Sequence, residues 1–194
     1  MSAFIKPPAK MPLIFRAAMR VVRKYAGKDL LLVRLLAWYP KVAVSSGVLE
    51  ALIAHQDGKL DERILKLVRL QASFAVACPF CIDMNARGFE GLITTEELQA
   101  LHGLVDLQSV ESFSTRERLA LQYTRLISST PLSFPRSFIE QLTGYFNERE
   151  IVILASTAAQ VNYWARLIQA LGVPTEGFLD KPDLYLQPPV GLDA

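Results

Sequence analysis

The two cysteines, Cys78 and Cys81, are the residues of this chain best suited to chemistry. They are the only cysteines among 194 residues, and Pro79 and Phe80 separate them in the stretch ACPFCIDMNARG. A CxxC pair can form a reversible disulfide, because one thiol attacks and the other resolves the product. It can also supply half of a zinc site, or two small hydrophobic side chains to a core.

Pro79 indicates where a helix begins, because proline is well tolerated in the first turn. We expect a helix over residues 80–90 that ends at Gly91, with Cys78 at its N-cap and Cys81 in its first turn. Both sulfurs would then lie at the positive end of the helix dipole, which favours the thiolate. The pattern therefore predicts a reactive dithiol.

Competing interpretations of the cysteine pair differ in how well the rest of the chain supports them. A zinc site needs two more ligands, yet His55 and His102 stand alone, 23 residues before Cys78 and 21 after Cys81. Structural zinc sites usually draw their ligands in close pairs, so we expect no metal and no cofactor. A thioredoxin-like motif would follow a strand, and no strand pattern precedes the pair. The interpretation that both cysteines only pack as small hydrophobic side chains, within the apolar stretch FAVACPFCI, stays open.

The elements that must position the cysteines read as helices, because apolar residues recur at spacings of three and four. Three helix starts carry a capping box, and Asp61 caps the helix before the cysteines. The boxes are Thr94 with Glu97, Ser114 with Glu117, and Asn147 with Glu150. Helices are expected over residues 13–25, 29–38, 41–56, 61–77 and 151–171, among others.

These patterns predict an all-α fold with a single multi-helix domain over residues 1–176 and an extended tail over 177–194. Residues 61–73 and 147–160 open alike, so the domain could derive from a duplicated helical unit. Within the domain we distinguish basic N-terminal helices, a CxxC core and closing helices, over residues 11–57, 61–91 and 94–172 respectively.

The charges are unevenly distributed along the chain. Residues 1–44 carry a formal charge of +8 and the remainder carries −6. A basic segment suits a phosphate, a membrane surface or an acidic subunit, or simply forms the solvated face of amphipathic helices. Because interleaved aromatic residues and a recognition helix are missing, we expect no nucleic-acid partner.

The apolar segments are too short to predict a membrane partner. The longest run without charge, residues 151–165, has 15 residues, fewer than the ~20 that a span needs. Pro7, Pro8 and Pro12 interrupt any secretory signal. We therefore expect a cytoplasmic protein, and in that compartment a close cysteine pair is more often catalytic or metal-binding than a structural disulfide.

The CxxC and its flanks resemble the alkylhydroperoxidase D and carboxymuconolactone decarboxylase family. The resemblance covers most of residues 30–175. The segments of this chain that carry it are LLAWYP, LKLVRL, CPFCIDMN and NYWARLIQALGVP. It implies an alkylhydroperoxidase D-like helical bundle, a homo-oligomer and membership of the CxxC-bearing, peroxidase-related branch. It also implies that Cys81 attacks a small hydroperoxide, that Cys78 resolves the product as a disulfide, and that an external dithiol reduces the pair.

Two positions depart from the family pattern, which is Glu, eleven residues, CxxC, three residues, His. Lys66 stands at the Glu position and Asn85 at the His position, where the family has a proton relay that activates the second cysteine. An amide does not titrate, and an ordinary lysine stays protonated. We hypothesise that the charge of Lys66 stabilises a thiolate and that Asn85 donates a hydrogen bond to sulfur or substrate. Alternatively, Lys66 is a solvated surface residue.

Two neighbours are weaker candidates for the same site. Arg69 lies one helical turn beyond Lys66 and is a second candidate cation, or another surface residue. Asp83 is a nearby carboxylate, or a solvated acid favoured by the helix dipole.

The sequence thus predicts a thiol-dependent peroxidase that works through a Cys78/Cys81 dithiol–disulfide cycle. The alternative is a non-catalytic or weakly active redox-responsive helical oligomer of the same family, which the altered relay positions favour. A module that binds polyanions through the basic N-terminal segment is a third interpretation.

Overall fold

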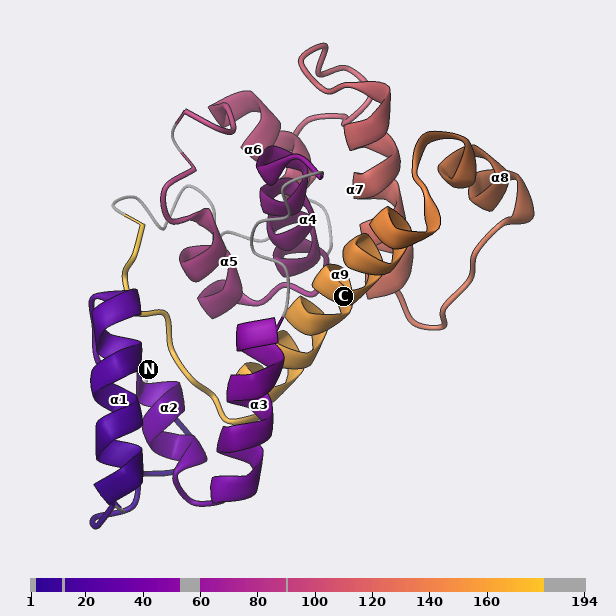
Figure 1. The fold of residues 1–194 in the computed structure, drawn as a ribbon. Helices are drawn as coiled ribbons and strands as arrows, with labels where there is room; N and C mark the ends of the chain where they lie inside the picture. Colours follow the sequence, from indigo (N-terminus) through magenta and orange to yellow (C-terminus); the bar gives the residue numbers. More distant parts are fainter. Residues whose placement is uncertain (1–2, 12, 53–59, 90, 180–194) are drawn as a thin grey trace.

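The structure is a computed structural model that describes residues 3–11, 13–52, 60–89 and 91–179 (Figure 1). In these ranges all nine regular elements are helices, which confirms the predicted all-α fold with a single domain. They are α1 (Leu13–Ala26), α2 (Leu31–Leu36), α3 (Pro40–Leu52), α4 (Glu62–Ala75), α5 (Pro79–Ala86), α6 (Thr95–His102), α7 (Thr115–Ser128), α8 (Arg136–Tyr145) and α9 (Glu148–Ala170).

Helix α4 lies at the centre of the fold. It packs against α5, α6, α7 and α9, which surround it in Figure 1. Leu65, Leu67, Val68 and Leu70 are all completely buried, because other helices pack around α4 and every residue from 67 to 74 is buried. This central helix runs directly into the turn that carries the cysteines.

The core divides into clusters on different sides of α4. One cluster joins α4 to α5 and α6, and contains Leu70, Ile82 and Leu98. Another joins α4 to the helices that follow, through Leu65 and Leu154 among others. A third cluster includes Cys78 and Cys81 and contacts α2 and α9. The cysteines are therefore part of the hydrophobic core.

Side-chain caps begin the helices where the sequence predicts them. Asp61 accepts a hydrogen bond from the backbone N–H of Arg63 at the start of α4. All three predicted capping boxes are present, at the N-termini of α6, α7 and α9. These caps satisfy backbone N–H groups that have no partner within their own helix.

Two helix ends differ from the prediction. Helix α4 ends at Ala75, two residues early, and Ala77 then has a positive φ of 46°. Helix α5 ends at Ala86 rather than near residue 90, because Arg87 is extended and Gly88 has φ +66°. Glycine adopts this left-handed conformation without steric cost. The chain thus turns away from α5 at Gly88, before the predicted end at Gly91.

Other predicted elements were incomplete or fall on residues that the structure does not describe. Helix α8 was not predicted individually, and Phe138 and Leu142 are its buried residues. The predicted end of the third helix near residue 56 and the tail beyond residue 179 lie outside the described residues. The duplication and the domain boundaries stay predictions. In the described part of the chain, no helix is long and apolar enough to cross a membrane.

Candidate active site

The cysteines form a disulfide at the N-terminus of α5. Cys78 is bonded to Cys81, and their Cα atoms are 5.2 Å apart. Cys78 is the N-cap residue, and its Sγ accepts a hydrogen bond from the backbone N–H of Cys81 at 3.3 Å. Pro79 occupies the start of the helix. The predicted placement of both cysteines at the start of a helix is therefore confirmed.

An apolar shell surrounds the sulfurs. Cys78 has an exposed fraction of 0% and Cys81 of 3%. The buried residues of this shell come from α2, α5, α9 and the segment after α9, and they are Leu32, Leu35, Phe80, Ala165, Ile168 and Val173. A molecule that reaches the sulfurs must therefore enter hydrophobic surroundings.

When the pair is reduced, the same geometry separates the pKa values of the two thiols. The pKa of Cys78 is lowered, chiefly by a hydrogen bond from the Cys81 thiol and further by the backbone N–H groups of Cys81 and Phe80, although burial opposes it. The pKa of Cys81 is raised by that hydrogen bond to Cys78 and by burial. A negative charge is therefore more stable on Cys78.

Asn85 belongs to a hydrogen-bond chain that joins α5 to α4. Its side-chain amide donates to the Ser73 hydroxyl at 3.0 Å, and that hydroxyl donates to the Arg69 carbonyl at 2.8 Å. The Ser73 carbonyl in turn accepts the backbone N–H of Cys78 at 3.1 Å. Asn85 and Cys78 are thus both anchored to Ser73, a buried residue that the sequence analysis did not identify.

The structure does not bring the Lys66 amine to the sulfurs. Its Nζ donates to the backbone carbonyl of Arg87 at 2.6 Å. Arg87 is the C-cap residue of α5, whereas Cys78 is the N-cap residue. The amine therefore lies at the opposite end of α5 from the cysteines, where a cation interacts favourably with the helix dipole.

Arg69 is buried, with an exposed fraction of 8%. Burial lowers its pKa, and the negative charge of Glu50 on α3 partly offsets this effect. Glu50 also accepts hydrogen bonds from Gln160 at 2.7 Å and Trp164 at 3.0 Å on α9. This polar group connects α3, α4 and α9 beside the apolar shell. Glu50 had no distinguishing motif in the sequence.

Asp83 is completely buried rather than solvated. Its carboxylate accepts backbone N–H groups from Glu176 at 3.0 Å, Phe178 at 2.7 Å and Leu179 at 2.9 Å. The segment after α9 is thereby fixed against α5, two residues beyond Cys81. Asp83 therefore anchors the segment after α9, which also contributes Val173 to the shell around the sulfurs.

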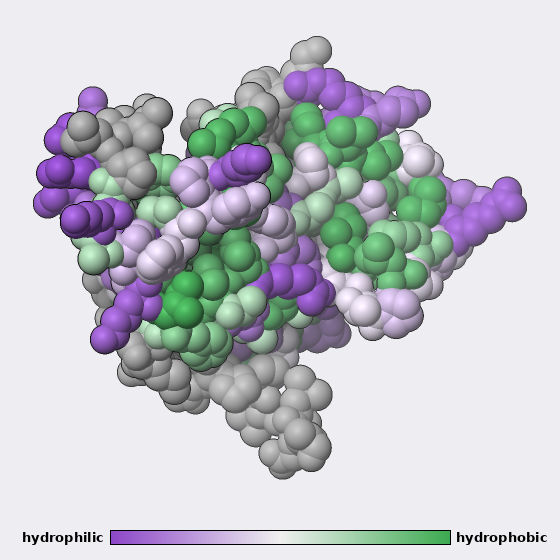
Figure 2. Space-filling view, turned by 90° about the horizontal axis from the view of Figure 1, so that it is seen from below, coloured by the Kyte–Doolittle hydropathy of each residue, from purple (hydrophilic) through white to green (hydrophobic). Residues whose placement is uncertain are grey.

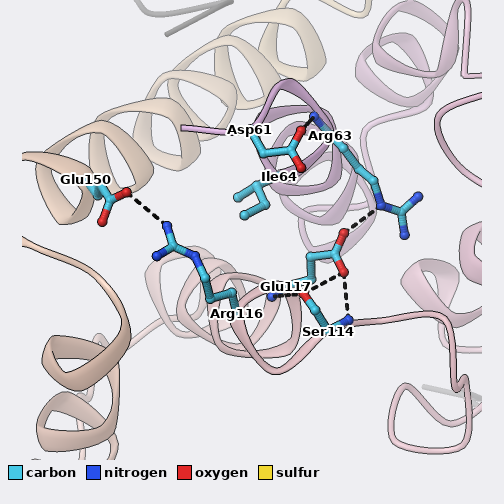
Figure 3. A pocket seen from close by; sticks show the side chains of 7 residues that line it. All are labelled: Asp61, Arg63, Ile64, Ser114, Arg116, Glu117 and Glu150. Carbon is cyan, nitrogen blue, oxygen red and sulfur yellow. Dashed lines mark hydrogen bonds and ion pairs between the residues drawn. The ribbon is translucent and has the colours of Figure 1, made fainter. Parts of the chain in front are cut away.

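A polar pocket lies elsewhere, where the N-termini of α4, α7 and α9 meet (Figure 3). Its charged side chains are already paired. Arg63 contacts Glu117 at 2.6 Å, and Arg116 contacts Glu150 at 2.9 Å. None of the predicted site residues lines this pocket, and its lining residues are Asp61, Arg63, Ile64, Ser114, Arg116, Glu117 and Glu150.

The histidines take no part in the dithiol site as far as the structure describes them. His102 stacks on Phe74, with 4.9 Å between ring centroids, and His55 lies outside the described residues. Within the described ranges, no group of three or more His, Cys, Asp or Glu side chains could hold a metal ion.

No protein-family model matches the chain. The uncharacterised protein YnjA of Escherichia coli (strain K12) is 24% identical over 179 residues, which span 92% of this chain and 97% of that protein. The uncharacterised protein YdfG of Bacillus subtilis (strain 168) is 26% identical over 108 residues, which span 55% of this chain and 72% of that protein.

Solved structures share the fold of this chain. The debrominase Bmp8, as a variant in complex with 2,3,4-tribromopyrrole, has a TM-score of 0.76 and 17% identity, with 96% of this chain and 97% of that one covered. An alkylhydroperoxidase AhpD core, an uncharacterised peroxidase-related protein from Ralstonia eutropha JMP134, has a TM-score of 0.74 and 16% identity, with coverages of 97% and 98%. The chain therefore has the alkylhydroperoxidase D-like fold that the sequence resemblance implied.

Proposed function

We propose that this protein is a thiol-dependent peroxidase whose working centre is the Cys78/Cys81 pair. The observation that carries the proposal is the cysteine pair at the N-terminus of α5, closed as a disulfide within an alkylhydroperoxidase D-like fold. A helix N-terminus stabilises the thiolate, which is the form of cysteine that attacks peroxides. A second thiol three residues away makes the oxidation reversible.

The proposed cycle consumes one hydroperoxide and one external dithiol. A thiolate of the pair attacks the peroxide, so an S–O bond forms, the O–O bond breaks and an alcohol or water leaves. The other thiol displaces hydroxide from the sulfenic acid, which gives water and the Cys78–Cys81 disulfide. An external dithiol then reduces the disulfide by exchange. The reducing cytoplasm is the proposed setting, because it supplies such a dithiol.

The apolar shell favours an organic hydroperoxide as substrate. Leu32, Leu35 and Ile168 contribute buried side chains beside the sulfurs, and such surroundings bind an alkyl group better than a polar one. We therefore expect a higher kcat/KM with cumene hydroperoxide than with hydrogen peroxide.

The test is peroxide consumption by the reduced protein with dithiothreitol, comparing wild type with Cys78→Ser and Cys81→Ser. We expect multiple turnovers only in wild type, because each variant lacks one half of the disulfide. Equal, slow consumption by all three proteins would contradict the proposal.

The likeness to Bmp8 adds a second substrate class to this test. Reductive debromination needs two electrons and replaces bromine with hydrogen. A dithiol supplies both electrons when it closes to a disulfide, while the C–Br bond breaks, bromide leaves and the carbon gains a proton. The reduced protein should therefore also be incubated with 2,3,4-tribromopyrrole. Bromide release that is lost in both serine variants, without peroxide turnover, would favour dehalogenation over peroxidase activity.

A redox-responsive protein without turnover is the alternative, and the positions of two residues favour it. Lys66 and Asn85 bond to Arg87 and Ser73, and neither can act as the acid–base pair of the family. Under this alternative the disulfide forms slowly with peroxide and does not cycle with a dithiol.

We also propose that the protein is a homo-oligomer. Figure 2 shows hydrophobic residues at the surface on the face seen from below. Large apolar side chains on and next to α3 are exposed, namely Trp38 at 62%, Tyr39 at 57%, Val44 at 63% and Val48 at 50%. Exposed apolar surface of this kind is typical of subunit contacts. Sedimentation equilibrium measures the mass directly, and a monomer at micromolar concentration would contradict this proposal.

A further inference from the structure

We propose that Cys78 is the attacking thiol and Cys81 the resolving thiol, the reverse of the order that the family resemblance implies. This inference rests on the proposed dithiol chemistry and assigns the role of each sulfur within it. It follows from the different positions of the two cysteines on α5.

Cys78 occupies the place in which a charged or polar acceptor normally caps a helix. Its backbone is extended, with φ −97° and ψ 101°, and its Sγ accepts the backbone N–H of Cys81. N-cap acceptors satisfy N–H groups that have no partner in the helix. A negative charge on this sulfur is stabilised by that N–H and by the helix dipole.

Cys81 lies in the first turn and acts as a donor to Cys78. Its backbone N–H donates to the Cys78 sulfur at 3.3 Å. The pKa shifts agree with this geometry, because the hydrogen bond between the thiols lowers the pKa of Cys78 and raises that of Cys81. Burial raises the pKa of both thiols, so it is hydrogen bonding that lowers the pKa of Cys78.

The group that activates the second cysteine in the resembling family is not reproduced beside Cys81. The position one helical turn beyond Cys81 carries Asn85, whose amide donates to Ser73 at 3.0 Å. An amide accepts no proton near neutral pH. The thiolate therefore forms on Cys78, where backbone N–H groups supply the stabilisation and no base is needed.

The reaction balances with these roles. The Cys78 thiolate attacks the terminal peroxide oxygen, the S–O bond forms, the O–O bond breaks and the alkoxide leaves with the proton of the Cys81 thiol. The Cys81 thiolate that remains then attacks the Cys78 sulfenic acid. The S–S bond forms, and hydroxide leaves as water after it gains a proton from solvent.

The first measurement is the thiolate absorbance at 240 nm as a function of pH in the reduced Cys78→Ser and Cys81→Ser variants. Both variants should fold, because serine is itself a preferred N-cap residue and also keeps a hydroxyl donor at position 81. We expect the Cys78 thiol in Cys81→Ser to titrate below the ordinary cysteine value of about 8.5. The Cys81 thiol in Cys78→Ser should titrate above it.

The second measurement is the rate of sulfenic acid formation after one equivalent of cumene hydroperoxide, trapped with dimedone and located by peptide mass spectrometry. We expect Cys81→Ser to react at least about tenfold faster than Cys78→Ser, as a pKa difference of one unit allows. A lower thiol pKa or a faster sulfenic acid in Cys78→Ser would overturn the inference. If wild type does not consume peroxide, the proposed function fails, while the titration still decides which sulfur carries the charge.

Discussion

The sulfur of Cys78 lies at the N-cap of α5, where many other helices have the side-chain oxygen of a serine or an aspartate. By accepting the Cys81 N–H, this sulfur caps α5, and in our proposal the same hydrogen bond stabilises its thiolate. The two relay positions of the resembling family have structural partners instead. Asn85 donates to Ser73, and Lys66 donates to Arg87. At the scale of single residues, our proposal is that backbone amides supply the thiolate stabilisation that the resemblance assigns to side chains.

Lys66→Met tests whether the lysine charge acts on the sulfurs. We expect the thiol titration at 240 nm to stay unchanged, because the amine lies at the C-terminal end of α5. The free energy of unfolding should fall by about 1 kcal/mol, since one hydrogen bond to the Arg87 carbonyl is lost. Lys41→Met, at an exposed position on α3, is the control. A thiol pKa that rises by one unit or more in Lys66→Met alone would show that the charge reaches the sulfurs.

Helix α5 is held between α4 and the segment that follows α9. Cys78 and Asn85 bond to Ser73 on α4. On the other side, Asp83 accepts three backbone N–H groups from residues 176–179. The direction of that segment depends on Gly172, which ends α9 with φ +63°. Helix α5 is thus connected both to α4 and to the segment that follows α9.

Gly172→Ala should destabilise the protein for two separate reasons. The left-handed conformation costs alanine roughly 1–2 kcal/mol, and the added Cβ would lie 2.6 Å from the Phe4 ring. Chemical denaturation of the variant measures the sum. Gly144→Ala is a matched control, because Gly144 is inside α8 with open space around it. That change should stabilise the protein by roughly 0.5–1 kcal/mol. Equal stability of both variants would contradict the role of Gly172.

Ion pairs and hydrogen bonds connect parts of the molecule that are far apart in the sequence. Arg63 on α4 bonds to Glu97 on α6 and Glu117 on α7, so one guanidinium links three helices. Near the N-terminus, Lys28 donates to the carbonyls of Glu176 at 2.6 Å and Gly177 at 2.7 Å. At least one lysine of the basic N-terminal segment therefore binds the chain itself.

Stability should depend on pH through Glu97. Burial alone would raise the pKa of this carboxyl, but hydrogen bonds from Arg63, Ser112 and the Thr94 backbone outweigh burial and lower the pKa from 4.5 to about 2. The ionised form therefore stabilises the fold above pH 4.5, and this stabilisation is lost as the pH falls towards 2.

The measurement is the free energy of unfolding from pH 6 to pH 2 for wild type and Glu97→Gln. We expect wild type to be more stable at pH 6 and the difference to shrink as the pH falls. Glu96→Gln, a change at an exposed neighbour on α6, should follow wild type. A constant difference between wild type and Glu97→Gln would contradict the ionic role of Glu97.

The sequence by itself determined the features that depend on local interactions. These are the all-helical fold, the three capping boxes and the start of α5 at Pro79 with Cys78 as its cap. Each depends on residues within one or two turns of each other, so their spacing is visible in the chain. The early end of α5 was missed because the prediction placed the helix end at Gly91, whereas the chain already adopts a positive φ at Gly88.

Only the tertiary structure decided what faces the cysteines. In the folded chain, Lys66 bonds to the Arg87 carbonyl. Asp83 is buried and binds the backbone of residues 176–179. Glu50 accepts hydrogen bonds from Gln160 and Trp164. The contacts of Asp83 and Glu50 join residues more than 90 positions apart along the chain. Such pairs form when helices pack, and packing depends on the fit of whole surfaces rather than on local spacing. The pattern of the chain therefore located the dithiol, whereas the packing of α4, α5 and α9 set its surroundings.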